Sequence, residues 1–145
     1  MKTRYGIKTT AGKGAILIRL TVGLIFLSEG IQKYLFPNTL GPARFETIGF
    51  SHPEFWAYFV GAFEIICGFL ILLGWLSRLA SIPLLIIMIT AFVKTKLPIL
   101  AGQGIWSMAH EYRTDFAMTM CLIWLLIFGS GKWSVDFNFF RSNKS

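Results

Sequence analysis

Four long apolar stretches constrain the fold of this chain more than any other feature of its sequence. They cover approximately residues 14–35, 55–75, 79–97 and 107–129. A helix rises about 1.5 Å per residue, so a segment of about 20 residues crosses the hydrocarbon core of a bilayer. Backbone polar groups in lipid need partners within the same segment, and the stretches lack the alternation of a β-strand. The sequence therefore predicts an all-α membrane protein with four transmembrane helices.

The overall composition agrees with this class and excludes several others. Hydrophobic residues make up 54% of the 145 residues and charged residues only 14%, whereas about 25% of an average soluble domain is charged. So apolar a chain is not disordered, and two cysteines are too few for a disulfide scaffold. The net charge is +7, but the sequence lacks the soluble basic face that nucleic-acid binding requires. We expect one domain over residues 1–145, with the lipid bilayer and no nucleic acid as its partner.

Turn residues and loop charge predict how the helices are connected. The stretches are separated by Pro37-Asn38, by residues 74–78 and by residues 98–104, which contain the Gly and Pro residues that end helices. The positive-inside rule then predicts an antiparallel four-helix bundle with both termini in the cytoplasm. The basic residues on the predicted cytoplasmic side are Lys2, Arg4, Lys8, Lys13, Arg78, Lys132, Arg141 and Lys144.

Ionisable residues inside the predicted helices are candidates for function, because a charge is costly in the membrane. Counting along antiparallel helices places most of them in the outer half of the bundle, and only Arg19 and Arg78 in the inner half, where we expect structural roles. Glu64 is the sharpest candidate, because it lies near the middle of the membrane and cannot snorkel to the surface. The outer-half residues are Glu29, Lys33, Glu64, Lys94, Glu111, Arg113 and Asp115.

The spacing of these residues predicts which of them share a helix face. Glu29 and Lys33 are four residues apart, in the favourable order for an ion pair within one helix. Glu111 and Asp115 have the same spacing, so two carboxylates share one face and need neighbouring cations if both are ionised. The predicted roles are proton transfer for Glu64, Glu111 and Asp115, and substrate binding for Glu29, Lys33, His110 and Arg113.

Each of these residues also has a structural interpretation. The Glu29–Lys33 pair would equally allow its helix to lie in lipid. Lys94 and Lys96 are expected to snorkel to the membrane surface rather than to enter a site. His110 is predicted to lie near the membrane interface, where it would be solvated and would bind no ligand.

No metal or haem is expected from this sequence. Haem would need a second axial ligand at a matching depth, and the other histidine, His52, is predicted to lie in a loop. Cys67 and Cys121 do not form a CxxC motif, and we expect both to be small buried side chains rather than a disulfide. Five glycines are predicted to be positions of close helix packing: Gly23, Gly30, Gly61, Gly68 and Gly74.

Small and charged residues follow a specific order along the first two predicted helices. The two patterns are Arg19-x-x-x-Gly23-x-x-Phe26-x-x-x-Gly30-x-x-Lys33 and Glu64-x-x-x-Gly68-x-x-x-x-x-Gly74-x-x-x-Arg78. They resemble the DoxX family of small membrane proteins, and residues 110–116 with residues 131–136 are similar to a bacterial branch of it. The resemblance covers about residues 14–136. It implies a multi-pass four-helix bundle in the bacterial inner (cytoplasmic) membrane.

The resemblance also implies a link to redox chemistry. The family takes its name from subunits linked to quinone-coupled thiosulfate oxidation and a terminal quinol oxidase. It therefore implies a redox-accessory subunit whose polar outer-half pocket binds a quinone or another small substrate. The sequence has no recognisable flavin, haem or iron–sulfur pattern, so a quinone or a partner's cofactor would carry the electrons. Whether the chain is itself part of a quinone-linked oxidoreductase is left open.

Two other functions fit the same sequence. The chain would act as a non-enzymatic anchor or scaffold if a partner docks on the exposed loop between Pro37 and Pro53, which contains Phe45, Phe50 and His52. The buried ion network would then be structural. A small-solute transporter is a third interpretation, for which so short a chain would have to dimerise. The partner, whether in a hetero-complex or a homo-oligomer, is not specified by the sequence.

Overall fold

The computed structural model describes residues 12–142, and this part of the chain is helical, without a strand. The prediction of an all-α protein is confirmed for these residues. Four basic residues used to predict the topology, Lys2, Arg4, Lys8 and Lys144, lie outside the described part. The elements are α1 (Ala15–Leu35), α2 (Pro42–Thr47), α3 (Pro53–Leu73), α4 (Ser77–Ala91), the π-helical turn η1 (Phe92–Lys96), α5 (Leu97–Gln103), α6 (Ile105–Phe128) and α7 (Val135–Ser142).

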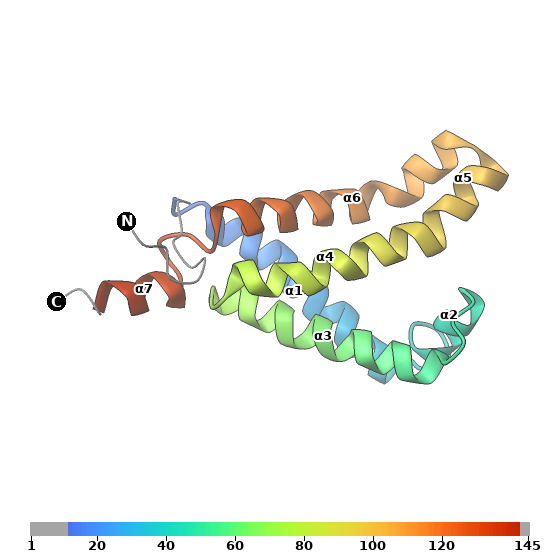
Figure 1. Cartoon of the computed structure of the whole chain (residues 1–145), viewed down its shortest axis with the longest axis horizontal. Coiled ribbons are helices and arrows are strands. Elements are labelled where there is room, and N and C mark those ends of the chain that lie inside the picture. Colours follow the sequence, from blue (N-terminus) through green and yellow to red (C-terminus); the bar gives the residue numbers. More distant parts are fainter. Residues whose placement is uncertain (1–11, 143–145) are drawn as a thin grey trace.

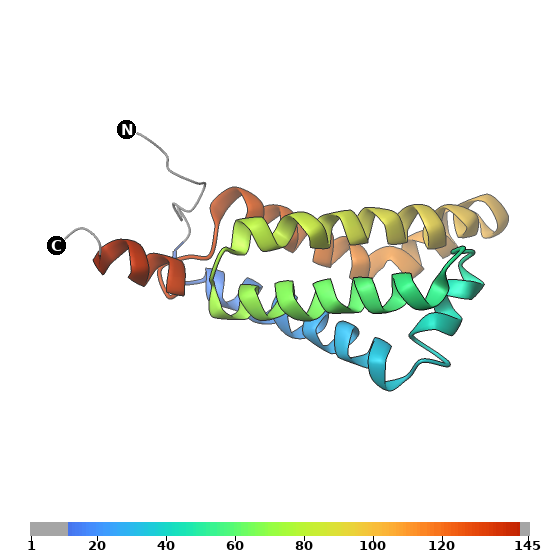
Figure 2. The same cartoon turned by 60° about the horizontal axis from the view of Figure 1, so that its bottom comes forward.

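The long helices run side by side along a common direction (Figures 1 and 2). One end of the molecule, called here the α2 end, contains α2 and the turn between α5 and α6. The opposite end, the α7 end, contains the turn between α3 and α4, the start of α1, and α7. Figure 1 also shows that α1 and α3 diverge from α5 and α6 toward the α2 end. The helices are therefore close together at the α7 end and farther apart at the α2 end, which gives the bundle the shape of a wedge.

Three helical segments are long and apolar enough to cross a membrane. They are α1, α3 and the continuous run from Ser77 to Gln103, which comprises α4, η1 and α5. The helix α6, predicted as the fourth span, has 24 residues, but its first half contains Glu111, Arg113 and Asp115, and it does not meet the same test. Length and composition thus support three of the four predicted spans.

The third helix continues beyond its predicted end. We expected it to stop near Pro98, but the helical run reaches Gln103. Pro98 lies in the first turn of α5, where its missing N–H and its fixed φ are tolerated. The run ends instead at Gly104, which has a φ of 87°, a conformation open mainly to glycine.

Glycines bring α1 and α3 together. A Cβ added at Gly30 would lie 2.7 Å from the carbonyl oxygen of Gly61, and one added at Gly23 would lie 2.9 Å from that of Gly68. The two backbones therefore approach each other as closely as in small-residue membrane interfaces. The packing role predicted for these four glycines is confirmed. Gly74 ends α3 with a φ of 70°, and it is also closely packed, since an added Cβ would lie 2.5 Å from Ser134 Cβ.

The alanine variant of Gly68 tests this packing. Its new Cβ would lie 2.9 Å from the backbone nitrogen of Leu27, so we expect Gly68→Ala to lower the free energy of unfolding by about 1–3 kcal/mol, the cost of overpacking. The matched control is Gly102→Ala in α5, where a Cβ meets no atom within 4 Å. Unfolding of both variants in detergent measures the difference, and equal stabilities would contradict the interpretation.

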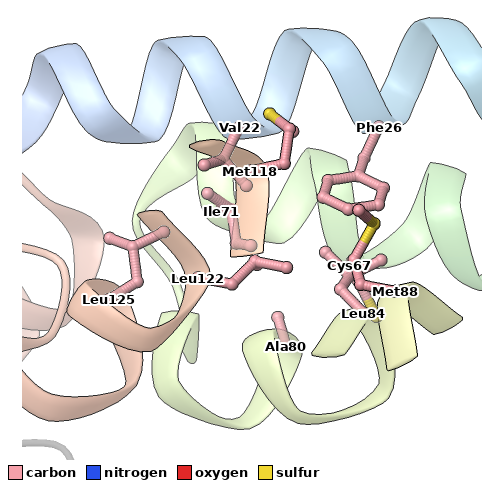
Figure 3. Close-up of a cluster of buried hydrophobic side chains, with 10 residues drawn as sticks. All are labelled: Val22, Phe26, Cys67, Ile71, Ala80, Leu84, Met88, Met118, Leu122 and Leu125. Carbon is pink, nitrogen blue, oxygen red and sulfur yellow. The ribbon is translucent and has the colours of Figure 1, made fainter. Parts of the chain in front are cut away.

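The apolar core fills the space between α1, α3, α4 and α6 (Figure 3). Cys67 lies in this core and Cys121 packs against its edge, and both are free thiols. Phe26, Met88 and Met118 form the side of the core that faces the α2 end, because they also line the cavity described below. The buried residues are Val22, Phe26, Cys67, Ile71, Ala80, Leu84, Met88, Met118, Leu122 and Leu125.

Two arginines donate hydrogen bonds to carbonyl groups at the α7 end, in or just beyond the last turns of helices. The buried guanidinium of Arg19 donates to the carbonyl oxygens of Ile71 at 3.0 Å and Leu72 at 2.6 Å, in the last turn of α3. It also donates to those of Ser130 at 3.3 Å and Trp133 at 2.5 Å, between α6 and α7. Arg78 donates in the same way to Ile127 near the end of α6, at 2.8 Å. Such contacts satisfy orphan carbonyls and hold the α7 end together.

Candidate functional site

A cavity of about 530 Å³ lies on the α2 side of the core, where α1 and α3 diverge from α5 and α6. Its volume is in the range of small-molecule binding sites. Apolar side chains from the long helices line most of it, among them Phe26 of α1, Phe59 of α3, Ile87 of α4 and Met118 of α6. The cavity is therefore a largely apolar site built between all four long helical segments.

An ion pair lies on the wall that α1 and α3 form. Lys33 Nζ is 2.6 Å from Glu64 Oε2, and the two residues are only 8% and 4% exposed. The ammonium also donates to the carbonyl oxygen of Glu29 at 3.3 Å. Gly30 and Gly61 each precede one member of the pair by one turn and allow the helices to approach. Close packing of α1 and α3 thus places a lysine and a glutamate in direct contact within an apolar cavity.

The ion pair predicted within α1 is also present. Lys33 Nζ is 3.8 Å from Glu29 Oε2, and the Glu29 side chain is 52% exposed. Lys33 therefore contacts both glutamates, but its closer partner is the buried Glu64 on the neighbouring helix. This arrangement leaves Glu29 at the edge of the cavity, between the ion pair and the surface.

A second ion pair lies on the wall that η1 and α6 form. Lys96 Nζ is 3.4 Å from Asp115 Oδ2, and both residues line the cavity. We expected Lys96 to snorkel to the surface, and this was wrong, because the residue is buried and 8% exposed. The physical reason is η1, because a π-helical turn changes the register that an α-helix would give the following residues.

The segment between α1 and α3 folds over the α2 side of the cavity. Phe45 of α2 is buried and lines the cavity with Arg44 and Ile48. Lys94 Nζ lies 5.3 Å from the centre of the Phe50 ring, so a cation–π contact joins η1 to this segment. We expected an exposed docking loop with Phe45 on its surface. That expectation was wrong for Phe45, which faces the cavity instead.

Three predicted site residues of α6 do not line the cavity. His110, Glu111 and Arg113 are exposed, and Arg113 Nη1 lies 3.5 Å from His110 Nδ1. Glu111 and Asp115 share a helix face, as their spacing predicts, but Glu111 lies one turn nearer to the α5–α6 turn, where the helix pairs diverge. The structure thus brings together four of the predicted site residues: Glu29, Lys33, Glu64 and Asp115. Lys94, which we expected to snorkel to the surface, also lines the cavity.

The chemistry of the cavity follows from these groups. Two ammonium groups can donate hydrogen bonds to an oxygen acceptor, and the carboxylates beside them can accept or release a proton. Within residues 12–142, no three His, Cys, Asp or Glu side chains come together as a metal site would require. The arrangement suits an apolar molecule that carries oxygen atoms and exchanges protons.

Comparison with known proteins identifies the family. The DoxX family model matches residues 14–97, more than half of the chain. "Uncharacterized membrane protein Rv3486" of Mycobacterium tuberculosis is 53% identical over 127 residues, which cover 83% of this chain and 78% of that protein. "Putative oxidoreductase CatD" of Bacillus subtilis is 29% identical over 135 residues, 91% of each chain. No solved structure matches. The chain belongs to the DoxX family.

Proposed function

We propose that this protein is a redox-accessory subunit of the bacterial inner membrane whose cavity binds a quinone or another small apolar substrate with oxygen acceptors. The observation that carries the proposal is the buried Lys33–Glu64 pair on the wall of an otherwise apolar cavity. Buried charge in a membrane protein is costly and tends to mark a substrate or proton pathway. The name of the B. subtilis relative, "Putative oxidoreductase CatD", agrees with a redox role.

The proposed topology has four antiparallel spans in one domain, with α6 as the fourth span and both termini in the cytoplasm. The cavity then lies in the outer half of the membrane. Exposed aromatic side chains at both ends of the molecule support this placement, since Tyr and Trp favour the two interfaces. They are Tyr34, Trp56 and Trp106 toward the α2 end and Trp75 and Trp133 toward the α7 end.

The charged groups have distinct roles in this proposal. Lys33 donates a hydrogen bond to an oxygen of the quinone, and Glu64 and Asp115 exchange protons with it. Reduction of a quinone to its quinol takes up two protons and two electrons, and a cofactor of a partner protein supplies the electrons. Glu111, exposed one turn beyond Asp115, passes protons between that carboxylate and water.

Binding of a short-chain quinone to the purified protein tests the proposal. We expect the wild-type protein to bind a short-chain ubiquinone analogue in isothermal titration calorimetry, and Glu64→Gln to weaken binding about tenfold, because a neutral amide orients Lys33 less strongly than the carboxylate does. The matched control is Glu54→Gln, an exposed carboxylate in the first turn of the same helix. Lipid extracts of the purified protein should also contain quinone.

Absence of quinone from the extracts, together with no measurable binding, would refute the proposal. The alternative is then a membrane anchor or scaffold that docks a partner protein or a second copy, with both ion pairs only holding the helices. Trp106 in the first turn of α6 favours this second candidate, because its side chain is 86% exposed. A partner that is captured by the wild type and by Glu64→Gln, but not by Trp106→Ser, would support it.

A further inference from the structure

Two lysine–carboxylate pairs line one cavity from different helix pairs. Lys33 and Glu64 belong to α1 and α3, whereas Lys96 and Asp115 belong to η1 and α6. Figures 1 and 2 show α1 and α3 on one side of the wedge and α5 and α6 on the other. The two ammonium groups therefore approach the cavity from separate walls.

The two lysines differ in how well the chain satisfies them. Lys33 has two close acceptors, Glu64 Oε2 at 2.6 Å and the Glu29 carbonyl oxygen at 3.3 Å. Lys96 has one polar partner among residues 12–142, Asp115 Oδ2, at 3.4 Å. A charge-assisted hydrogen bond normally measures about 2.7–2.9 Å, and an ammonium group has three donors. Lys96 thus keeps donors for an acceptor that the described chain does not provide.

The local backbone holds Lys96 in this position. The π-helical turn η1 covers residues 92–96 and ends at this lysine, and single π-helical turns inside helices occur frequently at functional sites. The hydroxyl group of Thr95 donates to the Ala91 carbonyl oxygen at 2.6 Å, within the same turn. Lys96 is also 8% exposed, although a lysine near a helix end usually extends to the surface. The fold therefore directs this side chain inward.

We propose that Lys96 is a second ligand-binding residue, and that the ligand is a ring with oxygen acceptors on two opposite edges, one for Lys33 and one for Lys96. Cyclic 1,4-diones have this pattern of acceptors. The apolar side chains of Phe26, Met88 and Met118 close the cavity between the two walls and contact the ring. This inference rests on the proposed function of the cavity. It adds that the ligand is recognised at two opposite edges of its ring.

Two bicyclic probes, one with carbonyl groups on two opposite edges of its ring and one with a single carbonyl group, test the inference. We expect the full-length protein in detergent to bind 1,4-naphthoquinone about tenfold to hundredfold more tightly than 1-tetralone, because a hydrogen bond from a charged donor is gained. In Lys96→Met this preference should disappear, while the affinity for 1-tetralone changes less than about twofold. The matched control is Lys132→Met, because Lys132 is exposed and does not line the cavity.

The outcomes separate this inference from the proposed function. If the wild type binds both probes equally, or if Lys96→Met keeps the preference, the two-edged inference is overturned while the cavity remains a binding site. If neither probe nor the quinone analogue binds, the proposed function fails and this inference fails with it. Should Lys96→Met not fold, the double variant Lys96→Met/Asp115→Leu removes both members of the pair and gives the same comparison.

Discussion

Replacing Lys33 with methionine is expected to lower the free energy of unfolding by about 3–5 kcal/mol, the usual cost of leaving one member of a buried ion pair without its partner. Glu64 is 4% exposed, and its carboxylate is 2.6 Å from Lys33 Nζ. Without this lysine, the charge would be buried in the apolar cavity without a counter-ion. Unfolding of the protein in mixed micelles by increasing dodecyl sulfate, followed by circular dichroism, measures the change.

The double variant Lys33→Met/Glu64→Met separates charge from packing. Replacing both members of a buried ion pair with apolar residues is often neutral, so we expect the double variant to regain most of the lost stability. It should nevertheless fail to bind the quinone analogue, because the proposed donor and proton-transfer group are both gone. A double variant as unstable as Lys33→Met would argue against an uncompensated charge as the cause.

Replacing Arg19 with methionine is expected to destabilise the protein by at least about 3 kcal/mol. Its guanidinium donates to four carbonyl oxygens, two in α3 and two between α6 and α7. Ile71 O also accepts from the N–H of Gly74, but each buried acceptor that is left unpaired costs about 1–3 kcal/mol. Arg19→Lys should recover only part of the loss, because an ammonium lacks the planar arrangement of five donors. The same unfolding experiment measures both variants.

Arg113→Met is the matched control for Arg19→Met. Arg113 is exposed, and the contact described for it is a 3.5 Å approach to His110, so its loss should change the stability by less than about 0.5 kcal/mol. If Arg19→Met behaved like Arg113→Met, the four carbonyl contacts would not be what holds the α7 end together. The comparison keeps the change in charge constant and varies only burial.

The first two long helices could be predicted closely because local chemistry marks their ends. The predicted span 14–35 corresponds to α1, Ala15–Leu35, and Gly74 ends α3 as expected. The third helix could not be predicted to its end, because Pro98 signals a stop in sequence but lies in the first turn of α5. Whether a proline ends a helix or begins a new one depends on the backbone before it, which the sequence does not reveal.

The candidate site was predictable where helical spacing and packing act together. Lys33 and Glu64 each follow a packing glycine by three residues, so a close approach of α1 and α3 brings them together. Lys96 was missed because it was expected to snorkel from the end of the third span, whereas the helical run continues to Gln103 and buries this residue at the end of η1. Glu111 was placed in the site because of its estimated depth in the membrane. That depth does not reveal that α6 diverges from α1, which leaves Glu111 outside the cavity.

The run from Ser77 to Gln103 is longer than the hydrocarbon core of the membrane is thick. Its 27 residues extend about 40 Å at about 1.5 Å per residue, whereas the hydrocarbon core measures about 30 Å. In the proposed topology, an upright run therefore projects about 10 Å into the layer of lipid headgroups. The first two turns of α6 descend from that height, so His110 and Glu111 lie among headgroups and water rather than acyl chains. A fourth span can thus begin with charged residues without burying them in hydrocarbon.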